Sequence, residues 1–307
     1  MPLHPEIQKI VRSIPSADGS RPDPAAVRAD EEARVPPHEQ RLPIRDVQAR
    51  TIPTRGGEVG VRIYTAADQE DYGLLIHFHG GAFFSGSLET YDQVGRALAQ
   101  ETGYRVITVG YRLAPENAFP AGLQDCCDAV RWAAEHGAEL HWDGRNLAVS
   151  GDSSGGNFAA AVTAKTHDEG FDAISHQVLY YPSVDLDFDE ARYPSLTENA
   201  RGYGLETAGL KPFNGHYIDS GADPSDPRVS PIKRPDLSGL PKALILTAQY
   251  DPLRDEGEAY GQRLAEAGVQ TQVHRYESAN HGFLVNFGWI PEMYEAFRET
   301  GRFLARQ

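Results

Sequence analysis

The chain contains very few cysteines and no long apolar run. Only Cys126 and Cys127 are cysteine among its 307 residues, which excludes a disulfide scaffold and a cysteine-rich zinc site. We expect this pair to be buried on a helix as small apolar side chains, in a reducing compartment. Apolar runs such as Ala243 to Leu246 are far shorter than the roughly 20 residues that span a bilayer. The first ten residues also lack the core of a signal peptide, so we expect a cytoplasmic protein.

Positive charge is also scarce. The chain has 29 Lys and Arg residues against 44 Asp and Glu residues, for a formal net charge of -15. Such a surface repels phosphate backbones and anionic lipids. We therefore expect neither a nucleic acid nor a membrane surface as a partner.

The pattern of apolar residues alternates between strand and helix along most of the chain. An antiparallel hairpin is predicted around Gly56 and Gly57, and strands separated by helices follow it, which indicates a mostly parallel sheet with helices on both faces. One α/β domain over residues 1–307 is expected. Strands are predicted at 74–79, 105–112, 177–182, 242–248 and 271–277, and helices at 90–103, 121–137, 255–268 and 291–307.

Two segments do not fit this alternation. The passage at about 183–238 is too long for a plain connector. Residues 1–45 are rich in Pro, Arg and Glu, and apolar residues at Ile7, Ile10, Val11 and Ile14 suggest a helix that lies over another element. We expect about 1–45 and about 183–238 to form a helical cap.

The segment Gly151-Asp152-Ser153-Ser154-Gly155 matches G-x-S-x-G at a place where a strand must turn into a helix. This context is typical of a nucleophile elbow, whose serine projects from a strained turn between two closely packed elements. Ser153 is the predicted nucleophile, and the N–H of Ser154 is a predicted oxyanion donor. The pattern also occurs by chance, but a phosphate-binding loop is excluded because no Lys follows the glycines.

Three further pieces support this chemistry. Gly80 and Gly81 follow the first strong strand, where bare backbone N–H groups complete an oxyanion hole. Asp251 follows a later strand, and His281 follows the last one. The order Ser, Asp, His is the one expected for an α/β-hydrolase fold, so the sequence predicts a catalytic triad of Ser153, Asp251 and His281.

Other residues compete for these roles. Asp255 and Glu256 fall inside the next predicted helix, His274 lies within a strand, and His216 lies in the long insertion. His77 and His79 alternate on one strand face as a metal pair would, but no third ligand is evident, and we expect no metal and no organic cofactor. Asp152, Arg112 and Glu116 form either a charged network behind the elbow or ordinary surface charges. Apolar residues near the motifs and in the insertion are candidates for substrate binding or for ordinary core packing: Phe84, Leu205, Leu210, Phe213 and Phe283.

Over about residues 72 to 285 the chain resembles the bacterial hormone-sensitive-lipase family of carboxylesterases, which are α/β hydrolases. The resemblance rests on six ordered segments: HGGAFFSGSLETYD, YRLAPENAFPA, GDSSGGN, DPRVSP, DPLRDEG and HGF. It implies that His79 orders the oxyanion loop. The chain departs from the family at Ala82, usually a third glycine, and at Ser154, usually alanine. Because both positions act mainly through the backbone, we expect altered acyl fit or rate.

These observations predict a serine carboxylesterase that hydrolyses short- to medium-chain esters, with a small ester as its partner. Two alternatives remain: an amidase or peptidase with the same triad, and a non-catalytic small-molecule receptor on the same fold. A homodimer through the outer strand at 271–277 is a further hypothesis.

Overall fold

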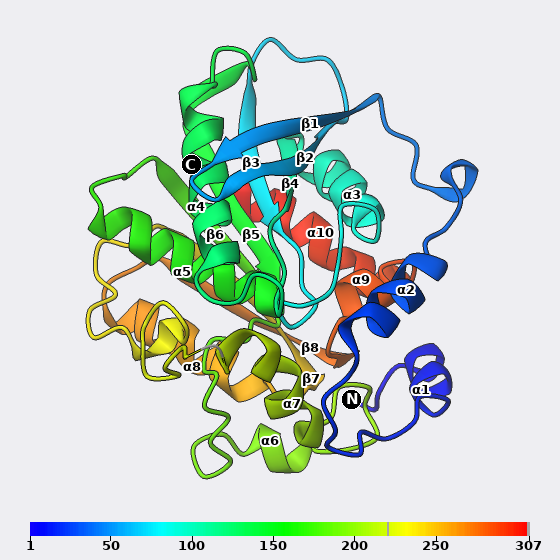
Figure 1. Cartoon of the computed structure of the whole chain (residues 1–307). Coiled ribbons are helices and arrows are strands. Elements are labelled where there is room, and N and C mark those ends of the chain that lie inside the picture. Colours follow the sequence, from blue (N-terminus) through cyan, green and yellow to red (C-terminus); the bar gives the residue numbers. More distant parts are fainter. Residues whose placement is uncertain (220, 306–307) are drawn as a thin grey trace.

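The computed structural model describes residues 1–219 and 221–305, and its centre is one eight-stranded sheet (Figure 1). The strands lie in the order β1-β2-β4-β3-β5-β6-β7-β8. β1 and β4 are antiparallel to β2, whereas the remaining neighbours are parallel, which confirms the predicted mostly parallel sheet. The strands are β1 (Asp46–Thr54), β2 (Gly57–Thr65), β3 (Tyr72–Phe78), β4 (Arg105–Gly110), β5 (Trp142–Asp152), β6 (Ile174–Tyr180), β7 (Lys242–Tyr250) and β8 (Thr271–Asn280).

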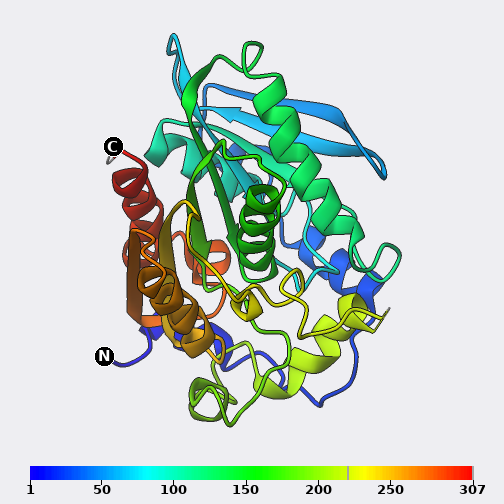
Figure 2. The same ribbon diagram turned by 90° about the vertical axis from the view of Figure 1, so that its left-hand side faces the viewer.

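Helices cover both faces of this sheet (Figures 1 and 2). In the predicted α/β region, each helix lies between two consecutive strands of the chain or after the last strand. The helices are α1 (Pro5–Val11), α2 (Pro24–Ala33), α3 (Asp92–Thr102), α4 (Ala121–Glu135), α5 (Ser154–Asp168), α6 (Ser195–Glu198), α7 (Thr207–Ile218), α8 (Arg254–Glu266), α9 (Phe283–Phe287) and α10 (Pro291–Leu304), with 3₁₀ turns at His38–Gln40 and Pro231–Lys233.

The two faces bury two separate hydrophobic cores. Along β3, Leu74 and Ile76 belong to one core, whereas Leu75 belongs to the other, because successive side chains of a strand point to opposite faces. The first core includes side chains of α4, α5 and α8, and the second includes side chains of α3 and α10. The near-continuous burial of β3 is typical of a parallel strand covered on both faces.

The N-terminal segment and the long insertion between β6 and β7 lie side by side (Figure 1). The N–H of Ala17 donates to Glu206 at 2.9 Å, and the ring of His216 contacts the carbonyl oxygen of Pro22 at 3.0 Å. The insertion, expected to belong to a helical cap, contains the helices α6 and α7. Two segments that lie far apart in the sequence therefore form one layer.

The predicted helix ends differ from the observed ones at both termini. α1 ends at Val11; Ile7 and Val11 are buried, but Ile10 and Ile14 are exposed, so only half of the predicted apolar positions lie over another element. The closing helix is predicted at 291–307, whereas α10 ends at Leu304. Residues 306 and 307 of that prediction, and residue 220 of the predicted cap, lie outside the described residues.

β8 is an edge strand of the sheet, as the sequence analysis predicts for 271–277. Its residue Val273 is 44% exposed. Within the described part of the chain, no helix has the length and apolar character needed to cross a membrane.

Candidate active site

Ser153 lies in a sharp turn between β5 and α5, with φ 54° and ψ -120°. A Cβ atom at Gly155 would lie 2.0 Å from the carbonyl oxygen of Phe78, and one at Gly151 would lie 2.1 Å from the carbonyl oxygen of Gly155. Real Cβ atoms do not approach backbone oxygens so closely, so both positions require glycine. The strained strand-to-helix turn predicted from the sequence is therefore present, for the predicted reason.

The loops after β5, β7 and β8 bring three predicted residues together. The Nε2 atom of His281 lies 3.0 Å from Oγ of Ser153, and its Nδ1 atom lies 2.8 Å from Oδ2 of Asp251. Because these three strands run parallel in one sheet, their carboxyl ends meet at the same edge. The structure thus joins a hydroxyl, an imidazole and a carboxylate in one hydrogen-bonded chain.

The carboxylate determines which imidazole nitrogen carries the proton. Asp251 has no exposed surface, and its other oxygen, Oδ1, accepts the N–H of Leu253 at 2.8 Å. An ionised carboxylate can only accept hydrogen bonds, so Nδ1 of His281 is the donor to Asp251. Nε2 is then left with a lone pair toward the hydroxyl of Ser153, as a general base requires.

The loop at residues 79–86, called here the oxyanion loop, follows β3 and differs from the prediction at Gly80. The N–H of Gly80 donates to Oη of Tyr91 at 2.9 Å and to Oδ1 of Asp152 at 3.0 Å. It is therefore not free to bind a substrate oxygen. In contrast, the N–H groups of Gly81, Ala82 and Ser154 donate no hydrogen bond to any residue of the described chain. Ala82, expected to affect only fit or rate, thus has a free N–H beside that of Gly81.

Ser154 also does more than the sequence analysis expects of it. Its side chain is buried, and its Oγ accepts the N–H of Phe83 at 3.2 Å. The expectation that this residue acts mainly through its backbone is therefore incomplete. Its hydroxyl joins the first turn of α5 to the oxyanion loop, a link that alanine would lack.

A buried histidine, His79, contacts the oxyanion loop, and a second buried histidine, His77, lies two residues before it on β3. Nδ1 of His79 contacts the carbonyl oxygen of Gly80 at 2.8 Å, and its ring stacks on Tyr111 at 4.2 Å between centroids. Nδ1 of His77 lies 3.0 Å from Oγ of Ser150. Burial lowers the pKa of His77 to about 3 and that of His79 to about 4. His79 thus holds the loop, as the resemblance implies, and both rings are neutral near pH 7.

His77 and His79 are also the two residues that could suggest a metal pair. In residues 1–219 and 221–305 no group of three or more His, Cys, Asp or Glu side chains is arranged to hold a metal ion.

Asp152 is buried beside the elbow, but the charged network considered for it is not formed. Its Oδ2 atom accepts the hydroxyl of Tyr91 at 2.9 Å, and burial raises its pKa to about 7. Arg112 instead pairs with Asp125 at 2.8 Å. Glu116 instead pairs with Arg28 at 2.8 Å. The hypothesis that Arg112 and Glu116 support Asp152 is wrong, because each has a nearer partner of opposite charge.

The residues considered for substrate binding fall into two groups. Phe84 and Leu210 are buried in the first core, and the ring of Phe84 contacts that of Phe213 at 6.3 Å between centroids. Leu205 and Phe213 are partly buried against the same core. Phe283 belongs to the second core, where its ring stacks on Tyr276 at 4.8 Å. The structure therefore groups the first four residues and separates Phe283 from them.

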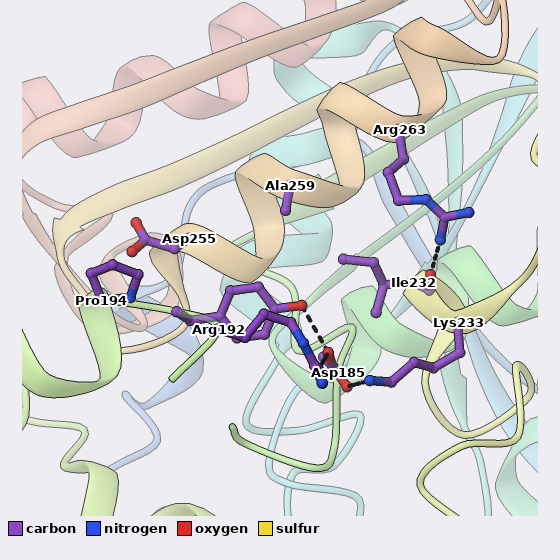
Figure 3. Close-up of a pocket in the computed structure, with 9 residues that line it drawn as sticks. Asp185, Arg192, Pro194, Ile232, Lys233, Asp255, Ala259 and Arg263 are labelled. Atoms are coloured by element: carbon purple, nitrogen blue, oxygen red, sulfur yellow. Dashed lines mark hydrogen bonds and ion pairs between the residues drawn. The ribbon is translucent and has the colours of Figure 1, made fainter. Parts of the chain in front are cut away.

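A pocket of about 470 Å³ lies beside α8 (Figure 3), and Ser153, Asp251 and His281 are not among the residues that line it. Arg192 and Lys233 both reach toward it, and both pair with the buried carboxylate of Asp185. Asp185 also accepts the hydroxyl of Tyr193 at 2.7 Å. Both side chains also pair with a second carboxylate, that of Asp187. Two cations therefore face two carboxylates, and neither Arg192 nor Lys233 is left to bind an anion in the pocket.

Three participants of the site were not predicted from the sequence: Tyr91, which binds Gly80 and Asp152, the N–H of Ala82, and the helix α2, whose residue Glu31 accepts hydrogen bonds from the oxyanion loop. Tyr91 lies inside the quoted segment HGGAFFSGSLETYD, but nothing in its spacing indicates that its hydroxyl returns to the loop. α2 comes well before the loop in the sequence, and no motif relates the two.

Comparisons with known proteins agree with the fold. A family model described as alpha/beta hydrolase fold matches residues 75–285. The chain is 39% identical over 246 residues to the esterase LipI of Mycobacterium tuberculosis, an alignment that covers 78% of this chain and 75% of that protein. It is 36% identical to the carboxylesterase NlhH of the same species, over 99% of this chain and 94% of that one. The hyperthermophilic esterase of the archaeon Pyrobaculum calidifontis superposes with a TM-score of 0.89 at 36% identity, covering 99% of this chain and 98% of that one.

Proposed function

The chain belongs to the α/β hydrolase family, and on that premise we propose that it is a serine carboxylesterase whose nucleophile is Ser153. One observation carries the proposal: Nε2 of His281 lies 3.0 Å from Oγ of Ser153 while Nδ1 lies 2.8 Å from Asp251. A non-catalytic receptor has no need of this chain of hydrogen bonds. The geometry thus favours turnover over binding alone.

The reaction follows from the roles of the three side chains. His281 takes the proton of Ser153 as Oγ attacks the ester carbonyl carbon, and it then gives this proton to the leaving alcohol. Asp251 holds the imidazole in the required tautomer and stabilises the imidazolium. These steps form the first half of the reaction, and their product is an acyl-enzyme. In the second half, His281 activates a water molecule, which attacks the acyl-enzyme and releases the acid.

The donors proposed for the oxyanion are the N–H groups of Gly81, Ala82 and Ser154. Gly80 was also predicted as a donor, but it is not included here because its N–H donates to Tyr91 and Asp152. Each free donor contributes on the order of 3 kcal/mol to transition-state stabilisation in a site of this kind. Both tetrahedral intermediates bear their negative charge at the same oxygen, so one set of donors serves both halves of the reaction.

We assign short- to medium-chain esters as the substrate class, under a cap formed by about 1–45 and about 183–238. This is supported by Phe84, whose side chain is buried against the insertion, with its ring 4.8 Å from that of His216. The first hydrophobic core contains Leu210, and the side chains of Leu205 and Phe213 pack against it. Rings packed against one another leave room for a short acyl group more readily than for a long one.

Hydrolysis of a panel of p-nitrophenyl esters, from acetate to palmitate, tests the function in wild type and Ser153→Ala. We expect the highest kcat/KM at short to medium chains and a loss of roughly 10⁴-fold or more in Ser153→Ala. An amide of the best acyl group, measured in parallel, separates an esterase from an amidase or peptidase. Substantial ester cleavage by the folded Ser153→Ala protein would refute the assignment, and a maximum at palmitate would refute the substrate class.

Two further proposals concern partners and location. We propose a homodimer in which the edge strand β8 pairs with its twin, supported by its exposed Val273; light scattering that shows a monomer would refute it. A cytoplasmic location is supported by the adjacent free thiols of Cys126 and Cys127, both buried. The net charge of -15 supports the expectation of neither nucleic acid nor membrane as a partner.

A further inference from the structure

The peptide group between Gly81 and Ala82 is held by its carbonyl side. The carbonyl oxygen of Gly81 accepts the N–H of Phe84 at 3.0 Å and the N–H of Ser85 at 2.9 Å. A trans peptide is planar, and its C=O and N–H bonds point in opposite directions. Anchoring the Gly81 oxygen therefore determines where the free N–H of Ala82 points.

The anchor is itself held by α2, a helix from the N-terminal segment. The hydroxyl of Ser85 donates to Oε1 of Glu31 at 2.8 Å, and the N–H of Gly86 donates to Oε2 of the same residue at 2.9 Å. The Ser85 hydroxyl also lies 3.2 Å from the carbonyl oxygen of Gly81. Because the hydroxyl has one proton, the shorter bond to the charged carboxylate is favoured. Glu31 thus binds two consecutive residues of the oxyanion loop with its two oxygens.

Movement of Ser85 would be transmitted to Gly81 because the two backbones are in close contact. A Cβ atom at Gly81 would lie 2.4 Å from the carbonyl oxygen of Ser85. Gly81 itself has φ 115°, a conformation that favours glycine. A shift at residues 85 and 86 therefore cannot be absorbed before it reaches the Gly81–Ala82 peptide.

We propose that Glu31 is a positioning residue for the reaction, which orients the N–H of Ala82 toward the oxyanion by fixing Ser85 and Gly86. The inference rests on the proposed function, since it concerns a donor of the proposed oxyanion hole. It assigns the N-terminal helix α2 a role in the rate of the chemical step, in addition to covering the site.

The test compares Glu31→Ala and Glu31→Gln with the control Asp30→Ala. Asp30 lies on the same helix, is exposed, and pairs with Arg34 next to that helix, so its removal leaves the oxyanion loop untouched. The amide introduced by Glu31→Gln would retain both contacts, since its oxygen accepts from Gly86 and its NH₂ donates to the hydroxyl oxygen of Ser85. Each protein is measured for kcat and KM with p-nitrophenyl butyrate and for thermal unfolding.

A trifluoromethyl ketone supplies a readout of the oxyanion hole alone. Oγ of Ser153 adds to the ketone carbon, the proton passes to His281, and the carbonyl electron pair remains on the oxygen. The resulting hemiketal oxyanion occupies the position of the tetrahedral intermediate. Its inhibition constant therefore reports on donor orientation without acyl transfer.

We expect Glu31→Ala to lower kcat about tenfold, a fraction of the 10²–10³-fold effect of losing a whole donor, with KM within about twofold. The inhibition constant of the ketone should rise by a similar factor. Glu31→Gln should recover most of the loss, and Asp30→Ala should match wild type.

The inference is overturned if folded Glu31→Ala keeps the wild-type kcat and inhibition constant. It is equally overturned if that variant loses thermal stability and activity while the ketone binds as before, because that pattern describes a merely structural role. Both results are distinct from failure of the proposed function, in which wild type itself cleaves no ester or Ser153→Ala remains active.

Discussion

The carboxylate of Asp152 accepts the N–H of Gly80 at 3.0 Å, which links the residue before the proposed nucleophile directly to the oxyanion loop. Tyr91 completes the link, since its hydroxyl binds both partners. The elbow and the loop are therefore held at a constant separation by buried polar contacts. A buried carboxyl group in this position also has consequences for stability as the pH changes.

Stability should depend on pH through Asp152. Burial raises the pKa of this carboxyl in the folded protein from 3.8 to about 7, so the folded state binds its proton more tightly than the unfolded state. Its contribution to the free energy of unfolding is complete below pH 3.8 and is lost as the pH rises through about 7. Asp152→Asn has no titrating group at this position. The free energy of unfolding of the wild type, minus that of Asp152→Asn, should thus fall by about 4 kcal/mol between pH 3.8 and about pH 7.

Urea denaturation of both proteins at several pH values measures this difference. Parallel curves for the two proteins from pH 4 to 8 would show that Asp152 is ionised in the folded state throughout, contrary to this prediction.

Asp251→Asn should lose most of the activity with little change in KM. An amide in place of the carboxylate favours the wrong tautomer of His281 and no longer stabilises the imidazolium, which costs about 10⁴-fold in kcat in a triad of this type. The matched control is Asp255→Asn, because Asp255 accepts the N–H of Ser195 at 2.7 Å and belongs to α8. Steady-state kinetics on p-nitrophenyl butyrate would contradict the assignment if the two variants lost activity equally.

Ala82 has φ 48°, in the left-handed region of backbone conformation that residues other than glycine rarely adopt. Such a conformation costs an alanine roughly 1 kcal/mol, and a β-branched residue more. Ala82→Gly should therefore raise the free energy of unfolding by about 0.5 kcal/mol, after the greater entropy of the unfolded glycine chain is subtracted. Ala82→Val should lower it by more than about 1 kcal/mol.

These changes are measured by urea denaturation, and kcat of Ala82→Gly should stay within about threefold of wild type because the proposed donor is a backbone N–H. A stabilised valine variant would be incompatible with the observed backbone.

Gly155→Ala should destabilise the protein strongly. Its Cβ would lie 2.0 Å from one backbone oxygen and 2.5 Å from another, so the strand β3 and the helix α5 must separate. We expect Gly155→Ala to lower the free energy of unfolding by more than about 3 kcal/mol.

The control is Gly144→Ala, at φ 76° with no heavy atom within 4 Å of the added carbon. This substitution tests the effect of the backbone conformation alone, and it should lower the free energy of unfolding by only about 1 kcal/mol. Thermal and urea unfolding compare the two variants, and equal losses would mean that the elbow is not tightly packed.

The sequence predicted the sheet, its covering helices and the sharp turn at Ser153 because each depends on local patterns. The periods of strands and helices can be recognised in consecutive residues. The elbow requires small residues two positions before and two positions after Ser153, and all of these residues belong to a single turn. The helix ends near Ile14 and at the C-terminus were less well predicted, since burial of a helix end depends on what it packs against.

By itself, the sequence determined which residue types could perform the chemistry and in what order they occur. Only the tertiary structure decided which backbone N–H groups are free. The N–H of Gly80 is occupied by Asp152, which lies 72 residues away in the sequence, and by the hydroxyl of Tyr91, which the fold returns to the loop from 11 residues further on. It also decided that Glu31 holds the oxyanion loop and that Phe283 lies in the second core, apart from Phe84. Contacts between segments far apart in sequence depend on how the sheet, the N-terminal helices and the insertion pack, and no local pattern encodes that packing.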